Sequence, residues 1–329
     1  MSRSLHPDAH AILTRLQQER ITALYHFTNV ENLPSICQIG ALYSKQILEE
    51  QGLLSTLVTG GNPLSHSLDR RQSNWDKVSL NFTPHTPMAY NKKRGQHLCF
   101  FLIKPEVTAW LDVVFTDTNA TKNDHKRGQG LMGLNNVQFS TVHAIPFSVN
   151  DWHRFVQAEV LIPNSIPLTY VTEIGFVSGA SMNYAKHLCG SLPCPLFSVI
   201  PQIFTDSPKA PSRAISFSYV HELILGDTKE SKNMIYSTHI KENKFSRRIS
   251  DKIAIVALVR VMAGMRAKIS LFETVTNKER VVIDEELPRS NEYKHECIIS
   301  LNNLPPGIYV VKYYLGDVCW ASSSFEVVP

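Results

Sequence analysis

The sequence of 329 residues lacks any hydrophobic run long enough to cross a membrane. Its longest apolar run, residues 253–259, falls far short of the about 20 residues that a spanning helix needs. Residues 1–16 also lack the apolar core of a secretory signal peptide. We therefore expect a cytoplasmic protein with no membrane partner.

Cysteine is scarce and widely spaced, with six residues over the whole chain. In a chain of this length, dispersed cysteines indicate reduced thiols rather than a disulfide framework. His187, Cys189 and Cys194 come close to metal-ligand spacing, but they lack a second pair of ligands at the spacing of a zinc finger. We expect buried thiols there and no bound metal. The lack of a clustered acidic or His/Cys ligand set also argues against a metal-dependent nuclease.

Charge of one sign is not in great excess, because 33 Lys and Arg face 29 Asp and Glu. The resulting net charge of +4 is compatible with a polyanionic partner without requiring one. Hydrophobic residues make up 43% and charged residues 19%, as in ordinary globular chains, so the composition excludes wholesale disorder. The sequence contains no internal repeat and no low-complexity tract.

The chain divides into two regions of different pattern. Residues 1–225 mix strand-like runs with short helical segments, and the charged stretch at residues 226–251 is typical of a linker or of a solvated face. Residues 252–329 contain six short strand candidates separated by polar turns, without a helical period. This order predicts an α+β fold: a mixed domain at 1–225, a linker at 226–251, and an all-β sandwich of immunoglobulin or fibronectin type at 252–329.

The segment at residues 157–162, QAEVLI, carries the first candidate chemistry. On a strand, side chains alternate between faces, so Gln157 and Glu159 share one face. Such a carboxylate suits glycosyl transfer from NAD, because it can stabilise the positive charge on the ribose as nicotinamide leaves and can accept a proton. The alternative is a solvated strand face with an incidental carboxylate.

The segment Tyr25-His26-Phe27-Thr28, at the end of a predicted strand, is the second candidate for a functional site. His26 can hydrogen-bond a ribose hydroxyl, and Thr28 with nearby backbone amides can hold the nicotinamide amide. Phe27 or Tyr43 can flank the nicotinamide ring. A histidine at a strand end is also commonly a satisfied structural group, so that interpretation stays open.

Arg70 and Arg71 follow Asp69 in a polar segment. An arginine at this place can clamp a pyrophosphate or activate an acceptor base. A plain surface position is the alternative.

Taken together, four segments resemble the DarT family of NAD-dependent toxins that ADP-ribosylate nucleic-acid bases. In chain order they are LYHFTNVENLPSICQIGALYS, DRR, VSLNFTPHTPMAYNKKRG and VQAEVLI, and the resemblance covers about residues 20–180. It implies an ADP-ribosyltransferase-type fold with NAD, as co-substrate, held against a split sheet. Residues 252–329 lie outside the resemblance.

The resemblance also assigns roles to residues of this chain. It implies a catalytic Glu159 and an essential arginine at Arg70 or Arg71. The implied NAD-binding residues, with Gln157 added from its place beside Glu159, are His26, Phe27, Thr28, Ser35, Tyr43 and Gln157.

An acceptor nucleic acid needs cations that face its phosphates and aromatic surfaces for stacking. The candidates for these contacts are Lys92, Lys93, Arg94, Lys126, Arg127 and Trp152. The alternative is that the basic clusters are solvated surface and Trp152 is core. Because a duplex hides the reactive base atoms, we expect a single-stranded or unpaired acceptor. The residues do not choose between DNA and RNA, and a protein acceptor stays open.

The sequence therefore predicts a toxin enzyme that transfers ADP-ribose from NAD to a base in single-stranded DNA or RNA. The resemblance further implies an antitoxin protein or reversing hydrolase as partner, in a toxin-antitoxin or phage-defence system. The competing hypothesis is a non-catalytic module that binds nucleic acid or protein with a degenerate transferase fold.

Overall fold

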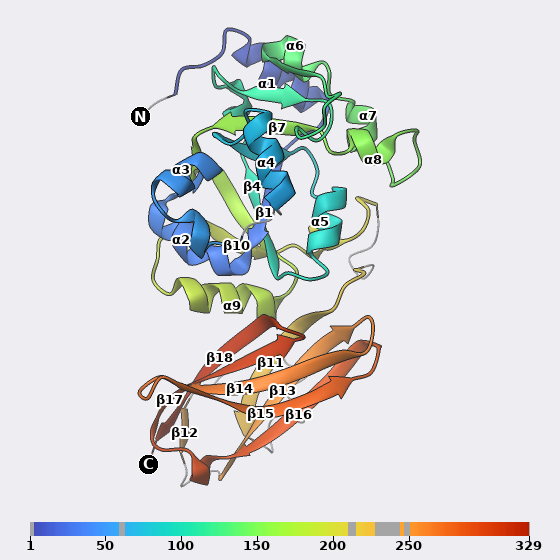
Figure 1. Cartoon of the computed structure of the whole chain (residues 1–329). Coiled ribbons are helices and arrows are strands. Elements are labelled where there is room, and N and C mark those ends of the chain that lie inside the picture. The colour runs from blue at the N-terminus through green and yellow to red at the C-terminus, as the bar shows by residue number, and fades with distance from the viewer. Residues whose placement is uncertain (1–2, 59–62, 210–214, 228–243, 247–250, 329) are drawn as a thin grey trace. The chain divides into compact units, whose positions relative to one another are not determined.

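The computed structural model describes residues 3–58, 63–209, 215–227, 244–246 and 251–328. By its internal contacts the chain forms two compact units: unit 1 contains Met1–Val177 and Cys189–Ile215, and unit 2 contains Ser178–Leu188 and Ser216–Pro329. Figure 1 shows that helices and strands mix in unit 1, whereas long strands dominate unit 2. Within the described ranges, no helix is both long enough and apolar enough to span a membrane.

Unit 1 is built on a sheet with the strand order β10-β9-β4-β1-β3-β7-β5-β6. Neighbouring strands are antiparallel except β9 and β10, which are parallel. The strands are β1 (Leu24–Asn29), β3 (Lys77–Asn81), β4 (Leu98–Ile103), β5 (Val114–Thr116), β6 (Arg127–Gln129), β7 (Glu159–Pro163), β9 (Val171–Phe176) and β10 (Leu196–Val199). The central strand β4 is a continuous apolar run that is buried almost throughout, as expected for a strand covered on both faces.

Short helices and a small second sheet surround these strands. The second sheet pairs β2 (Ala41–Tyr43) with β8 (Ser165–Pro167). The helices are α1 (Ala9–Gln18), α2 (Leu33–Ile39), α3 (Lys45–Glu50), α4 (Pro63–Arg71), α5 (Pro87–Lys92), α6 (Gly130–Leu134), α7 (Phe139–Val142), α8 (Trp152–Phe155) and α9 (Gly179–Cys189), the last of which falls largely in unit 2. Gly40 ends α2 with a φ of +75°, a left-handed conformation that favours glycine.

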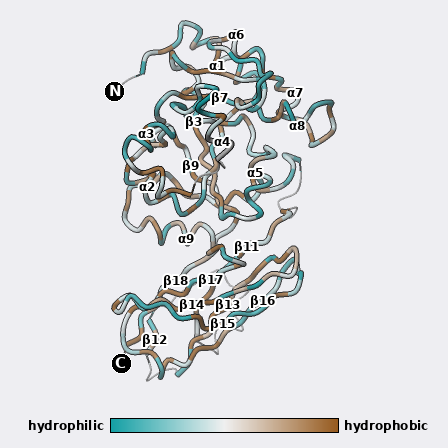
Figure 2. Tube along the Cα trace, in the orientation of Figure 1, coloured by the Kyte–Doolittle hydropathy of each residue, from teal (hydrophilic) through white to brown (hydrophobic). Residues whose placement is uncertain are grey.

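Unit 2 contains two sheets, ordered β11-β13-β16 and β12-β18-β17-β14-β15. Their strands are β11 (Tyr219–Asp227), β12 (Lys244–Ser246), β13 (Lys252–Val261), β14 (Met265–Glu273), β15 (Lys278–Leu287), β16 (Ser290–Ser300), β17 (Gly307–Leu315) and β18 (Val318–Val328). Along β16, buried His295, Cys297 and Ile299 alternate with exposed residues, the period of two that packs one face of a sheet. Figure 2 shows hydrophobic and hydrophilic residues alternating along such strands. The predicted fold class, α+β followed by all-β, is confirmed.

The division between the two units lies earlier in the chain than the predicted boundary at residue 225. β11 pairs with β13 from Tyr219 opposite Arg260 to Asp227 opposite Ile253, so hydrogen bonding places it in unit 2. Of the predicted linker, residues 228–243 and 247–250 lie outside the described residues, and β12 within it pairs with β18. A charged composition does not prevent such pairing, because an edge strand needs only backbone partners.

Candidate active site

The site begins where β1 and β3 separate. These strands pair at Tyr25 opposite Asn81, whereas the other edges of both strands are paired along their lengths with β4 and β7. Beyond that pair, the His26 ring bridges the gap, with Nδ1 3.0 Å from the carbonyl oxygen of Ser79. A side chain thus takes the place of the next backbone bond, and the sheet is split there.

An open cavity of about 250 Å³ lies at the split. It is lined by residues of β1, α2, β2, α3, α4, β3 and β7 and by the segment around Ala120. The predicted site residues that line it are His26, Phe27, Thr28, Ser35, Tyr43 and Glu159. Residues separated by more than a hundred positions in the sequence therefore meet in one space, and their roles in catalysis and in NAD binding stay predictions.

Glu159 is the first residue of β7 and lies opposite Asn81 of β3 and Thr116 of β5. Its Oε2 accepts a hydrogen bond from the backbone amide of Ala120 at 3.4 Å. Burial raises the pKa of Glu159 to about 7, although hydrogen bonds from Ser79 and Ala120 favour the charged form and partly oppose this shift. The carboxyl group therefore titrates near neutral pH, where it can both stabilise positive charge and accept a proton.

The protonation of His26 follows from its surroundings. Burial lowers the pKa of His26, which favours the neutral ring at neutral pH, although the bond to Ser79 favours the charged form. The Ser79 carbonyl oxygen can only accept a hydrogen bond, so Nδ1 carries the proton. In the neutral ring, Nε2 then presents a lone pair to a hydroxyl group of a ligand.

Asn32 fixes the end of β1, a role that the sequence reasoning missed. It is 5% exposed, and its Nδ2 donates to Thr28 Oγ1 and to the Val58 carbonyl oxygen, each at 2.9 Å. Its Oδ1 accepts from the Val58 amide at 2.9 Å, so the contact with Val58 is reciprocal. Thr28 and Val58 both line the cavity, and Asn32 holds them together. An asparagine four residues after a motif threonine was the available signal.

Lys45 and Asp69 add a second pair of charges that was not predicted as site residues. Lys45 Nζ bonds Asp69 Oδ2, and both side chains line the cavity. Lys45 favours and Asp69 disfavours the charged form of Glu159, so the pair tunes the carboxyl group in opposite directions. Asp69 was visible in the sequence as the first residue of the DRR segment.

Neither arginine of that segment lines the cavity. Arg70 Nη2 lies 2.6 Å from Glu49 Oε1, and its guanidinium group lies 3.8 Å from the centre of the Trp75 ring. Arg71 is exposed at the end of α4. A catalytic role for either arginine stays a prediction, and for Arg70 it requires exchange of the Glu49 contact for one with a ligand.

Gln157 requires a correction, because it does not share a strand face with Glu159. β7 begins at Glu159, and Gln157 lies in the turn that follows α8. Its Nε2 donates to the carbonyl oxygen of His153 at 2.5 Å, and the residue does not line the cavity. The side chains of Gln157 and Glu159 do not alternate as on a strand, because the extended conformation starts two residues later than predicted.

Two predicted nucleic-acid contacts are buried and also require correction. Lys93 is 4% exposed, and its Nζ donates to the carbonyl oxygens of Phe204 and Thr205 at 2.7 and 2.9 Å. Trp152 is 6% exposed, and its ring packs against Phe147 at 5.2 Å between centroids. Neither side chain faces solvent, so Lys93 is not available to a phosphate and Trp152 is not available to a stacked base.

The other predicted contacts with nucleic acid lie nearer the surface. Lys92 is half-buried in α5, and Arg94 is exposed and stacks on the Tyr90 ring at 4.0 Å. Lys126 is exposed, and Arg127, also exposed, donates from Nη1 to the Gln72 carbonyl oxygen at 3.0 Å. Their part in binding nucleic acid stays a prediction.

Comparison with known proteins adds a family and several relatives. The sequence model of the family described as DarT, ssDNA thymidine ADP-ribosyltransferase, matches residues 25–203. A DNA ADP-ribosyl transferase-DNA ADP-ribosyl glycohydrolase fusion protein from Thermosipho africanus is 25% identical over 174 residues, which are 47% of this chain and 42% of the relative. The chain thus spans less than half the length of that curated relative.

Solved structures of the same family are also similar. The DarT of Thermus sp. 2.9 in complex with NAD+ matches with a TM-score of 0.44 and 18% identity, over 56% of this chain and 97% of that one. The Thermosipho africanus DarTG in complex with ADP-ribose matches with a TM-score of 0.46 and 22% identity, over 56% of this chain and 51% of that one.

Proposed function

The chain belongs to the DarT family, whose sequence model spans more than half of its residues, and from this premise we propose that it transfers ADP-ribose from NAD+ to thymidine in single-stranded DNA. The observation that carries the proposal is the position of Glu159 in one cavity with His26, Phe27 and Thr28. These side chains come from strands that are distant in sequence, and their meeting at a split in the sheet provides both a binding surface and a reactive carboxyl group.

The cavity offers complementary contacts for NAD+ as a substrate. The Nε2 lone pair of His26 accepts from a ribose hydroxyl, and the end of β1 at Thr28 supplies backbone groups for the nicotinamide amide. Phe27 and Tyr43 provide aromatic surface for the ring. The bonds of Asn32 to Thr28 and Val58 hold this wall in place before the substrate arrives.

Glu159 supplies the chemistry. The bond between ribose C1′ and the nicotinamide nitrogen breaks, its electron pair leaves with nicotinamide, and positive charge develops on the ribose next to the carboxylate. A thymine ring nitrogen then forms the new bond to C1′, and its proton passes to Glu159. A pKa of about 7 suits this proton transfer, because the group is ionised in part before the reaction and accepts the proton afterwards.

The acceptor follows from the family and from base chemistry. In a thymidine nucleotide the ring nitrogen that bears a proton is N3, and base pairing in a duplex occupies it, so an unpaired strand is required. RNA, which lacks thymine, is the less favoured polymer. Exposed Lys126 and Arg127 are our candidates for contacts with the DNA backbone.

We place the protein in a toxin-antitoxin or phage-defence system. Modification of thymidine blocks base pairing, so a cell that contains such an enzyme needs a means of reversal. The Thermosipho relative carries a DNA ADP-ribosyl glycohydrolase in the same chain as its transferase. A glycohydrolase that removes ADP-ribose from DNA is the antitoxin chemistry that fits this protein.

The test is incubation with NAD+ and separate pools of single-stranded DNA, duplex DNA and RNA, followed by mass analysis of the nucleosides. We expect an ADP-ribosyl adduct on thymidine from single-stranded DNA, with release of nicotinamide. Glu159→Gln should form the adduct about 1,000-fold more slowly, so that none is detected in the time in which the wild type completes the reaction. Glu173→Gln is the matched control, because Glu173 is a half-buried carboxylate in β9 of the same sheet that does not line the cavity.

Each result has a distinct meaning. An adduct on RNA or on protein, with none on DNA, would support ADP-ribose transfer by this protein but contradict single-stranded DNA as its acceptor. If the folded wild-type protein forms no adduct and releases no nicotinamide, the proposal of an enzyme is wrong. That result would favour the non-catalytic binding module.

A further inference from the structure

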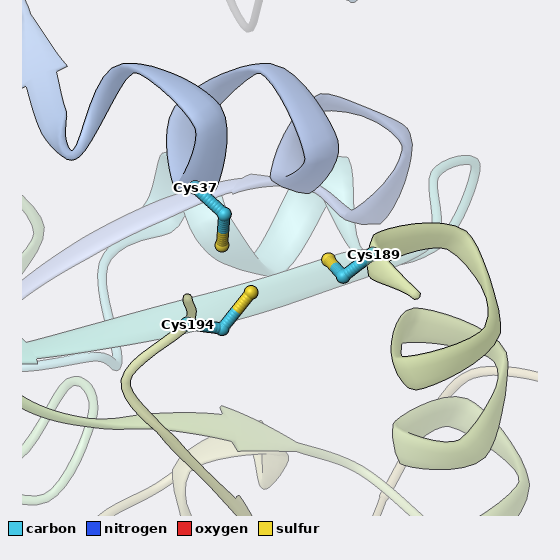
Figure 3. Close-up of side chains that lie close together, drawn as sticks. All are labelled: Cys37, Cys189 and Cys194. Carbon is cyan, nitrogen blue, oxygen red and sulfur yellow. The ribbon is translucent and has the colours of Figure 1, made fainter. Parts of the chain in front are cut away.

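Three cysteines that do not themselves line the cavity converge in unit 1. The Sγ atoms of Cys37, Cys189 and Cys194 all lie within 4.8 Å of one another, and Figure 3 shows them pointing toward a common space. Cys37 and Cys189 are 1% and 5% exposed, and Cys194 is half-buried. The cluster is therefore mostly buried, and Cys194 is its partly exposed member.

Each cysteine comes from a different segment, so the cluster is a tertiary feature. Cys37 lies in the last turns of α2, Cys189 is the final residue of α9, and Cys194 precedes β10. Gly190 has a φ of +56°, and the Leu192 amide donates to the Cys189 carbonyl oxygen at 3.0 Å, which turns the chain back after α9. This turn brings Cys194 beside Cys189, and Cys37 completes the group from a position far earlier in the chain.

The spacing fits a tetrahedral ion. With Zn–S bonds of about 2.3 Å and tetrahedral angles, two thiolate sulfurs of one zinc site lie about 3.8 Å apart. No pair in the cluster is more than 4.8 Å apart, so no separation exceeds that of a zinc site by more than about 1 Å, a difference that side-chain rotation can remove. A disulfide would use two of the sulfurs and leave the third unexplained, whereas a metal ion uses all three.

We propose that Cys37, Cys189 and Cys194 form a binding site for Zn²⁺ with three thiolate ligands. Soft thiolate ligands select zinc over magnesium and calcium, which prefer oxygen. Among the described residues, no further His, Cys, Asp or Glu joins the three, so water or a small thiol completes the tetrahedron on the side of half-buried Cys194. His187, which the sequence grouped with Cys189 and Cys194, is exposed and is not a ligand.

This proposal departs from the sequence-based expectation of buried thiols with no bound metal, because the three thiols lie together rather than apart. The place of the site in the fold also gives it a consequence: α2 contributes Ser35, Ile36 and Ile39 to the cavity wall, and Cys37 is on the same helix. A bound ion would join α2 to the segment between α9 and β10 and stabilise that wall.

The experiment measures zinc bound to the reduced, full-length protein by elemental analysis and by competition with a chromophoric chelator. We expect about one zinc ion per chain. Cys37→Ser, Cys189→Ser and Cys194→Ser should each lower the affinity by at least about 100-fold, because each removes a direct ligand. Zinc should also raise the thermal midpoint of the wild type and leave that of Cys194→Ser unchanged.

Two cysteines outside the cluster serve as controls, because their burial matches that of the proposed ligands. Cys297 is buried and Cys319 half-buried, and neither belongs to the cluster, so Cys297→Ser and Cys319→Ser should bind zinc like the wild type. If a variant at the two buried positions fails to fold, cobalt binding by the wild type and by Cys194→Ser decides the question through the sulfur-to-cobalt charge-transfer band.

The proposal fails if the reduced wild type binds no zinc or cobalt, or if the three variants bind as tightly as the controls. It also fails if protein purified under reducing conditions holds a disulfide between any two of the three cysteines. Since the readout is bound metal, the result is independent of the proposed transferase activity.

Discussion

The two units differ in what their buried polar side chains contact. In unit 2, buried His295 has its Nδ1 2.6 Å from the Tyr313 hydroxyl oxygen and its Nε2 3.0 Å from Glu285 Oε1, between long and regular strands. In unit 1, Glu159 and His26 face a cavity at a place where two strands of the sheet separate. Unit 2 thus uses its polar groups for its own structure, whereas unit 1 holds some of them ready for a ligand at a cost to stability.

The largest effect expected from this difference is on catalysis. Glu159→Gln should lower the rate of ADP-ribose transfer about 1,000-fold, equivalent to about 4 kcal/mol, because it removes the negative charge that stabilises the transition state. Affinity for NAD+ should change little. Single-turnover transfer to a thymidine-containing oligonucleotide measures the rate, and calorimetry measures the affinity.

The control for this prediction lies in unit 2. Glu296→Gln changes an exposed carboxylate of β16 and should leave the transfer rate at the wild-type value. An equal loss in both variants would show that the rate reports general stability rather than the cavity.

A second prediction concerns Trp152, expected from the sequence to stack a base but buried in the structure. Trp152→Ala should destabilise unit 1 by about 3 kcal/mol through lost packing. Among the described residues, its indole Nε1 has no hydrogen-bond partner, so Trp152→Phe should cost clearly less. Chemical denaturation measures both. If Trp152→Ala leaves the stability unchanged and weakens acceptor binding, Trp152 contacts the nucleic acid as the sequence predicted.

The third prediction is a gain of stability with a defined pH dependence. The folded state raises the pKa of Glu159 from the ordinary 4.5 to about 7, so it favours the protonated form and loses stability as pH rises through this window. Glu159→Gln removes that penalty. The variant should equal the wild type below pH about 4.5 and exceed it above pH about 7 by about 2 kcal/mol, a value reduced for partial solvent exposure.

Denaturation of both proteins at several pH values tests this sign. A variant that is less stable than the wild type at alkaline pH would mean that the charged carboxylate is stabilised by the fold, and the carboxyl group would no longer be poised for catalysis.

The smallest predicted effect is a loss of stability in unit 2. Tyr313→Phe removes the hydroxyl group that contacts His295 Nδ1 and should destabilise the protein by about 1 kcal/mol, at every pH where His295 is neutral. Loss of the ionisable carboxyl group at Glu159 is thus expected to stabilise unit 1 above pH about 7, whereas loss of the Tyr313 hydroxyl group is expected to destabilise unit 2. Stabilisation in both would abolish the distinction between the units.

Local pattern carried much of the prediction of the fold. The mixed strand and helix pattern of residues 1–225 and the six short strand candidates of residues 252–329 are signals between neighbours in the chain, and hydrophobic patterning reports them directly. The candidate site residues His26, Thr28 and Glu159 came from a resemblance to a family that the comparison confirms, and the structure brings the three to one cavity. Boundaries were less accurate, as the start of β7 and the placement of β11 show.

By itself, the sequence determined the two-part α+β and all-β organisation and a set of residues suited to glycosyl transfer. The tertiary structure decided which of them meet: β1 and β3 separate beside Glu159, Lys93 is buried under backbone carbonyls, and Cys37 joins two cysteines about 150 positions away. The physical reason is that periodicity is a property of neighbours along the chain. Contacts between distant segments depend on how sheets and helices pack, and no short pattern encodes them.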